Sequence, residues 1–251
     1  MRTDAATPIA GSELLALIEI LKEATARASS NRGREAPQRQ LPGMQETPEV
    51  DWAAITEAFT RRLVAISSVS PGPGEIKAAQ EALTILREGA LEPAYAESGL
   101  HPIADAQHGP SIAYGPVRGG SAPTGVIPAH LGQCVTADYG TLEPYALAPD
   151  ELAIRFAELV AIAPEVAAFD PAEWMYGRGV ADMKSGVAAM LAVARHLAQR
   201  NRIQPLPFSV LAIATVDEGN ESSGAIAAGA LLAALPERHG PTYVGALHRA
   251  Y

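Results

Sequence analysis

The chain has 251 residues and is 48% apolar, so it is long enough for one large domain or two small ones with a sizeable core. Its formal net charge is −9 and no basic stripe is visible, which excludes a nucleic-acid binder, because phosphate contacts supply much of the affinity of such proteins. No apolar run approaches the roughly 20 residues that span a bilayer, which excludes a membrane protein, and the single cysteine, Cys134, excludes an internal disulfide and a cysteine zinc cluster.

Residues 1–46 are predicted to be an N-terminal appendage made of a helix and a flexible linker. One face of a helix over residues 11–28 collects four apolar side chains, Leu14, Leu17, Ile18 and Leu21. Glycine, proline and charged residues then interrupt the pattern. The appendage holds six basic and six acidic side chains, so the whole excess of acid lies in residues 47–251. The N-terminus lacks the charged, apolar and cleavage-site order of a secretory signal, which indicates a cytoplasmic protein.

Helices and short apolar strands alternate from residue 51 onward. Asp51 can cap a helix over 52–66, and a second helix over 75–89 would end at Gly89. Strands are predicted at 111–115, 124–129, 207–215 and 242–247, and further helices at 149–164, 183–200 and 222–240. The 207–215 run is apolar on both faces, as expected of a buried central strand. The predicted fold class is therefore α/β, with a helix-covered, mostly parallel or mixed central sheet.

Three polar residues stand where predicted strands end or helices begin, which is where α/β sheets gather ligands. His130 follows the strand 124–129, Glu218 follows the strand 207–215, and Asp182 precedes the helix 183–200. Imidazole and carboxylate groups suit zinc, and a further carboxylate can act as base for a metal-bound water. Each residue also has a simpler interpretation. Asp182 can cap the helix, His130 can be an ordinary half-buried histidine, and Glu218 can belong to a solvated turn.

Several segments resemble one family of zinc amidohydrolases. "YGRGVADMKSGVAAMLAVARHL", residues 176–197, resembles the second metal motif of the family that includes carboxypeptidase G, acetylornithine deacetylase, succinyl-diaminopimelate desuccinylase and aminoacylase. "ATVDEGNESSG", residues 214–224, is similar to the acidic third motif. "DWAAITEAFTRRLVAISSVSPGPGE" and "TADYGTLEPYALAPDEL" are most similar to the arginine-utilisation branch of that family. The similarity runs from about residue 50 to the C-terminus.

The resemblance implies a role for each site residue. Asp182 matches the carboxylate that bridges two zinc ions, His130 matches the histidine ligand of the first motif, and Glu218 matches the general base. It also implies a cis peptide bond between Asp182 and Met183. The cofactor would be zinc, and the substrate a small-molecule amino-acid derivative or peptide cleaved at an amide bond.

The chain departs from the family pattern in its metal ligands. The first motif should read His-x-Asp, in which the Asp lies behind the histidine ligand and orients it, but Gly132 stands at the place of the Asp; with a short gap, Gln133 would instead take the ligand position. The third motif should carry two consecutive glutamates, but Gly219 replaces the second. A later Asp ligand is matched by Ala250. The last histidine ligand and the smaller lid domain would lie beyond Tyr251, so the resemblance implies an incomplete catalytic domain without its lid.

Two hypotheses of function remain from the sequence. The first is a dinuclear-zinc hydrolase of amide bonds, linked to arginine utilisation, that is truncated and binds metal at most weakly or partially. The alternative is a catalytically inactive pseudoenzyme that acts, if at all, as a binding or interaction protein. A third hypothesis is an α/β domain without a metal site in which Asp182 only caps a helix, and the resemblance of several segments to the amidohydrolase family disfavours it. The sequence does not indicate an oligomeric state.

Overall fold

The computed structural model describes residues 50–88, 97–104, 108–120, 124–239 and 244–246. The predicted appendage over 1–46, the proposed helix end at Gly89 and the position of Ala250 lie outside these residues. The division into an appendage and a domain over 47–251 therefore stays a prediction.

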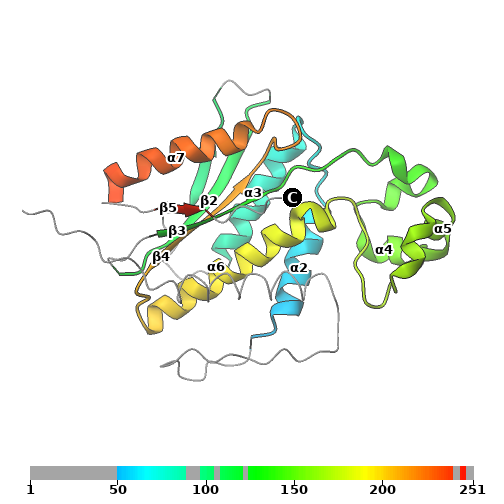
Figure 1. Cartoon of the computed structure of the whole chain (residues 1–251), viewed down its shortest axis with the longest axis horizontal. Helices are drawn as coiled ribbons and strands as arrows, with labels where there is room; N and C mark the ends of the chain where they lie inside the picture. Colours follow the sequence, from blue (N-terminus) through cyan, green and yellow to red (C-terminus); the bar gives the residue numbers. More distant parts are fainter. Residues whose placement is uncertain (1–49, 89–96, 105–107, 121–123, 240–243, 247–251) are drawn as a thin grey trace, which may run out of the picture.

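The centre of the molecule is a five-stranded mixed sheet with the order β1-β2-β4-β3-β5 (Figure 1). The strands are β1 (Gly99–Pro102), β2 (Ser111–Val117), β3 (Thr124–His130), β4 (Ser209–Thr215) and β5 (Val244–Ala246). β2 pairs antiparallel with β1 and β4, whereas β3 runs parallel to both β4 and β5. Six of the seven residues of β4 are buried, so the run that is apolar on both faces is a central strand, as predicted.

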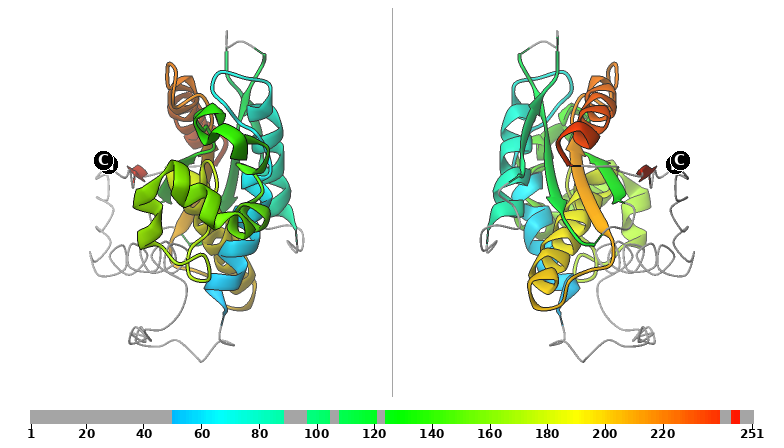
Figure 2. Two further views of the ribbon diagram at one scale, coloured as in Figure 1. Left: turned by 90° about the vertical axis from the view of Figure 1, so that its right-hand side faces the viewer. Right: turned by 90° about the vertical axis from the view of Figure 1, so that its left-hand side faces the viewer.

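Helices cover the sheet, which confirms the predicted fold class. α2 (Trp52–Val64), α3 (Gly74–Arg87) and α6 (Ser185–Ile203) lie on one side, and α7 (Ser223–His239) lies on the other (Figure 2). Asp51 caps α2 as predicted, because its carboxylate accepts a 2.9 Å hydrogen bond from the backbone N–H of Ala54. Within the described ranges, none of the helices combines the length and the hydropathy that crossing a bilayer requires.

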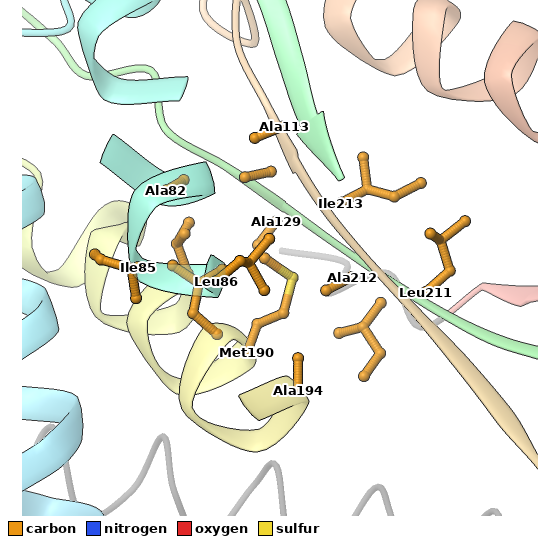
Figure 3. Close-up of a cluster of buried hydrophobic side chains, with 14 of the residues drawn as sticks. Ala82, Ile85, Leu86, Ala113, Ala129, Met190, Ala194, Leu211, Ala212 and Ile213 are labelled. Atoms are coloured by element: carbon orange, nitrogen blue, oxygen red, sulfur yellow. The ribbon is translucent and has the colours of Figure 1, made fainter. Parts of the chain in front are cut away.

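The main core lies between the sheet and the α3–α6 layer (Figure 3). Ile85 and Leu86 of α3 meet Met190 of α6 above strand alanines such as Ala129 and Ala212, and all five are buried. The small strand residues let the helices approach closely, so the large side chains fill the space between the layers. This packing fixes the start of α6, and thereby the loop that precedes it.

Residues 137–176 form an arm beside the sheet, with a small core of its own made of Leu142, Leu152 and Leu159 (Figure 1). It contains η1 (Ala137–Tyr145), α4 (Pro149–Ile154), α5 (Phe156–Ile162) and η2 (Pro164–Ala168). The single helix predicted over 149–164 was wrong, because the chain leaves helical geometry at Arg155 (φ −96°, ψ 21°). The Arg155 guanidinium lies 4.0 Å from the Tyr145 ring centroid and donates a 2.8 Å bond to the Tyr145 hydroxyl.

Candidate functional site

The predicted site residues lie at the edge of the sheet where β3 and β4 end. The two strands are parallel and His130 is in register with Thr215, so their carboxyl ends share one edge. η3 (Val180–Lys184) leads into α6 and brings Asp182 to the same place. The Nε2 atom of His130 lies 3.2 Å from the Oδ1 atom of Asp182. The structure thus brings His130 and Asp182 together, whereas the role of the predicted site residues stays a prediction.

The two members of the His130–Asp182 pair differ strongly in exposure. The side chain of His130 is 10% exposed, whereas that of Asp182 is 64% exposed. The other ring nitrogen of His130, Nδ1, is buried and has no hydrogen-bond partner among the residues that the structure describes. Two residues further along the chain, Gly132 offers no carboxylate. The position at which the His-x-Asp motif carries a carboxylate is thus a glycine, and the Nδ1 atom of His130, on the side of the ring away from Asp182, is left without a partner among the described residues.

Asp182 does not occupy the capping position of α6. That position belongs to Lys184, two residues later, and the capping side chain of a helix normally comes from the capping residue itself. The peptide bond between Asp182 and Met183 is cis, as the resemblance implied. Gly179 has a left-handed φ of 78°, which lets the chain turn tightly before η3.

Glu218 lies on the loop that follows β4 and is exposed. A Cβ atom built on Gly132 would lie 3.7 Å from the backbone nitrogen of Glu218, so this loop passes beside the end of β3. The preceding residue, Asp217, has a φ of 59° and accepts bonds from the N–H and the hydroxyl of Ser223. Burial acts to raise the pKa of Asp217, but the hydrogen bonds from Ser223, Asn220 and Glu221 together outweigh it and lower the pKa.

Lys184 is fully buried, which the sequence did not predict. Its amine donates a 2.7 Å bond to the carbonyl of Ile66 and a 2.5 Å bond to Oε1 of Gln133. Burial lowers the pKa of Lys184 to about 7. Because the Gln133 oxygen is engaged by Lys184 while His130 contacts Asp182, the geometry favours His130 over Gln133 as the residue at the ligand position.

A second residue that the sequence did not single out is Glu75, near the start of α3, which is 1% exposed. Its Oε1 atom accepts a 2.5 Å bond from the Ser70 hydroxyl and a 2.6 Å bond from the backbone N–H of Asp217. Glu75 therefore ties the turn before α3 to the loop that carries Glu218. Local sequence offered no signal for this, because a glutamate in a first helical turn is ordinary.

The side chains of the described residues do not fit a dinuclear zinc centre. Across the part of the chain that the structure describes, no group of three or more His, Cys, Asp or Glu side chains is arranged to hold a metal ion. His130 and Asp182 provide two ligands, whereas a catalytic zinc ion usually has three protein ligands. Gly132 and Gly219 supply none of the carboxylates that the family motifs carry at these places.

Comparisons with known proteins agree with the motifs. Residues 157–250 match the model of the peptidase family M20/M25/M40. Protein RocB of Bacillus subtilis (strain 168) is 30% identical over 178 residues, which cover 70% of this chain and 31% of RocB. The uncharacterized protein YqjN of the same bacterium is 27% identical over 205 residues, which cover 79% of this chain and 36% of YqjN. The chain thus spans about a third of the length of these curated relatives.

Solved structures with a similar course of the chain include the LapA aminopeptidase of Legionella pneumophila, with 12% identity, a TM-score of 0.48 and coverage of 98% of this chain and 48% of that one. The dipeptidase Dug1p of Saccharomyces cerevisiae has 14% identity, a TM-score of 0.48 and coverage of 92% and 40%. Human carnosine dipeptidase 1 has 17% identity, a TM-score of 0.47 and coverage of 94% and 41%. By its sequence, this chain is therefore a relative of the M20/M25/M40 peptidases, with Protein RocB among its relatives, as the motifs around Asp182 predicted.

Proposed function

We propose that this chain derives from a dinuclear-zinc hydrolase of amide bonds in amino-acid derivatives or small peptides and has lost the metal-dependent reaction. The observation that supports this most directly is the His130–Asp182 pair, because within the described residues no third His, Cys, Asp or Glu side chain joins it in an arrangement that could hold a metal ion. The unpartnered Nδ1 atom of His130 supports the same conclusion, since loss of a partner behind a metal ligand typically costs about 10–100-fold in metal affinity or activity.

The function that the remaining site supports is binding without hydrolysis. Asp182 presents a largely exposed carboxylate at the sheet edge, and Glu218, on the loop that passes beside the end of β3, is also exposed. Exposed acidic side chains at one edge of the sheet favour a ligand that carries a cationic group, such as the guanidinium of an arginine derivative. The similarity to RocB supports a role in arginine utilisation, and the cytoplasm stays the proposed location.

The test is a metal and turnover measurement on the purified full chain. After incubation with zinc and dialysis, we expect well under one zinc ion per chain, and no hydrolysis of N-acetyl-arginine or other N-acyl amino acids above the buffer rate. Calorimetric titration with N-acetyl-arginine should give binding that weakens in the Asp182→Asn variant. Two zinc ions per chain together with turnover would restore the active-hydrolase hypothesis. Absence of both turnover and binding would reject the binding role alone.

A further inference from the structure

The side of the molecule formed by α2 and α6 carries an apolar groove with a volume of about 570 Å³. Trp52, Ile55 and Phe59 line it from α2, and Trp52 and Ile55 are only partly buried. On the α6 side, the Arg195 guanidinium lies 5.1 Å from the centroid of the Phe59 ring. Phe59 is buried, so the groove exposes Trp52 and Ile55 in part, and partly exposed apolar side chains along a groove suit contact with another segment.

The groove begins where the described chain begins. Val50 and Asp51 belong to its lining, so residues 1–49 are joined to the described chain at the groove itself. Within them, Leu14, Leu17, Ile18 and Leu21 recur with the spacing i, i+3, i+4 and i+7. This is the spacing by which an amphipathic helix places its anchors in a hydrophobic groove. The sequence thus offers an occupant whose pattern suits the surface.

The length of the chain between residues 11–28 and the groove also suits this occupant. Residues 29–49 can span about 70 Å when extended and about 25 Å as a random coil, so they can return residues 11–28 to a groove that starts at Val50. A tether of this kind holds the segment at an effective concentration in the millimolar range.

The charges of the segment also match those of the groove. Around a helix, Glu13 and Lys22 flank the apolar face on opposite sides. The groove offers Arg195 on the α6 wall and Asp51 on the α2 wall, so each charge can face one of opposite sign.

We propose that residues 11–28 dock as an amphipathic helix in the α2–α6 groove of the same chain. The proposal does not depend on the fate of the metal site, which lies at the sheet edge. It predicts that the apolar face of the segment lies against α2, and that its opposite face, with Glu19, points away.

Cross-linking on the full chain tests the orientation. In a Cys134→Ser background, Ala58→Cys provides a thiol on the α2 wall, at an exposed position that lines the groove. It is combined with Ile18→Cys on the apolar face or, as the matched control, with Glu19→Cys on the opposite face. With a short bismaleimide we expect about tenfold more intramolecular cross-link for Ile18→Cys than for Glu19→Cys. Equal yields would overturn the proposal, and cross-linked dimers would assign the groove to a second copy instead.

A fluorescence measurement provides an independent check. Trp174→Phe leaves Trp52 as the only tryptophan, because the chain has two. Adding Leu17→Asp and Ile18→Asp should then make Trp52 more accessible to acrylamide, with an increase of about twofold in the quenching constant as burial in the groove is lost. Glu19→Asp and Glu23→Asp serve as the control pair and should leave quenching unchanged. An unchanged constant in the Leu17→Asp, Ile18→Asp chain would contradict docking.

Discussion

Glu75 is the residue whose loss should most disturb the surroundings of the site without touching the His130–Asp182 pair. Glu75→Gln converts an acceptor of bonds from Ser70 and Asp217 into a group that also carries donors, in a position that is 1% exposed. We expect the free energy of unfolding to fall by about 2 kcal/mol, the range of hydrogen bonds to charged groups. The measurement is urea denaturation, with the midpoint shifted and the slope unchanged.

The matched control for this change is Glu81→Gln on the same helix. Glu81 forms an ion pair with Arg62 and its side chain is 24% exposed, so water remains available to both partners. Exposed ion pairs contribute about 0–1 kcal/mol, and the control should cost no more than that. If Glu75→Gln and Glu81→Gln lowered the free energy of unfolding equally, the buried carboxylate of Glu75 would not stabilise the fold more than an exposed ion pair does.

The two glycines that replace family carboxylates should respond differently when acidic residues are put back. A Cβ atom on Gly132 would lie 2.7 Å from the Ser70 hydroxyl, which already bonds to Glu75. A Cβ atom on Gly219 would meet only the Ser70 Cβ, at 4.0 Å. Gly132→Asp should therefore cost about 1–3 kcal/mol of stability without a gain in metal binding, because the space has been filled.

Gly219→Glu should instead fold normally and add a third ligand beside His130 and Asp182. Losing the hydrogen-bond partner of a metal ligand typically lowers metal affinity by about 10–100-fold, and losing a ligand itself should lower it at least as much. Restoring a ligand at residue 219 should therefore raise the zinc affinity by at least about tenfold. Competition with a fluorescent zinc chelator measures the change, and Gly229→Glu on the exposed face of α7 serves as the charge control. No gain in affinity would place residue 219 outside the reach of the pair.

At the scale of single residues, the sequence predicted the positions that belong to local motifs, and it did not predict the roles that depend on contacts between distant parts of the chain. The 3.2 Å contact of His130 and Asp182 could be predicted, because each residue stands at a recognisable strand end or helix start. The roles of Lys184 and Glu75 could not, since their partners lie 118 and 142 residues away, in Ile66 and Asp217. A charged side chain is expected at the surface unless its partners are known.

At the scale of the element, α7 depends on a glycine at its start. A Cβ atom on Gly224 would lie 2.1 Å from the carbonyl oxygen of Val216, the residue that directly follows β4. That oxygen is backbone and cannot rotate away, so Gly224→Ala should force α7 off the sheet and lower stability by about 2 kcal/mol or more. Gly229→Ala, on the same helix, meets no atom within 4 Å and should stabilise by about 0.5–1 kcal/mol through helix propensity.

Thermal unfolding of the two alanine variants distinguishes packing from propensity. Opposite shifts of the melting temperature are expected, downward for Gly224→Ala and upward for Gly229→Ala. Two upward shifts would mean that the start of α7 has room to move, and that the loop with Glu218 is not held by this contact.

The elements that the sequence predicted well are those with a clear period. β4 and α6 carry long apolar patterns, and their observed bounds, Ser209–Thr215 and Ser185–Ile203, lie close to the predicted ones. β1 was missed because Gly99–Pro102 is only four residues long, contains glycine and proline, and is defined by its pairing with β2. The break at Arg155 was missed because it coincides with a contact to Tyr145, outside the predicted helix, which no pattern within 149–164 reveals.

At the scale of the whole molecule, the fold and the metal chemistry can be separated. The mixed sheet is complete enough to bury a continuous core on α3 and α6, and this core contains none of the site residues. The site depends on the end of β3 and on two loops at the same sheet edge, and a single substitution there, such as glycine for a glutamate ligand, can remove a ligand while the core is untouched. A chain of this kind can lose the reaction and keep the fold.

The stability of the full chain should accordingly be independent of zinc. A ligand that binds only the folded state adds about 2.7 kcal/mol when its free concentration is 100 times the dissociation constant. In a domain of this size, 1 kcal/mol shifts the melting temperature by about 2–4 °C, so an intact zinc centre would lose roughly 5–10 °C on chelation. Because His130 and Asp182 are the two ligands that the described part of the chain brings together, we expect a shift of less than about 1 °C between zinc and EDTA in a calorimetric scan. The Gly219→Glu chain is the internal comparison, because its added ligand should make the melting temperature rise with zinc. A fall of several degrees when EDTA is added to the unmodified chain would show that further ligands complete the site, and would reverse the proposal that the reaction has been lost.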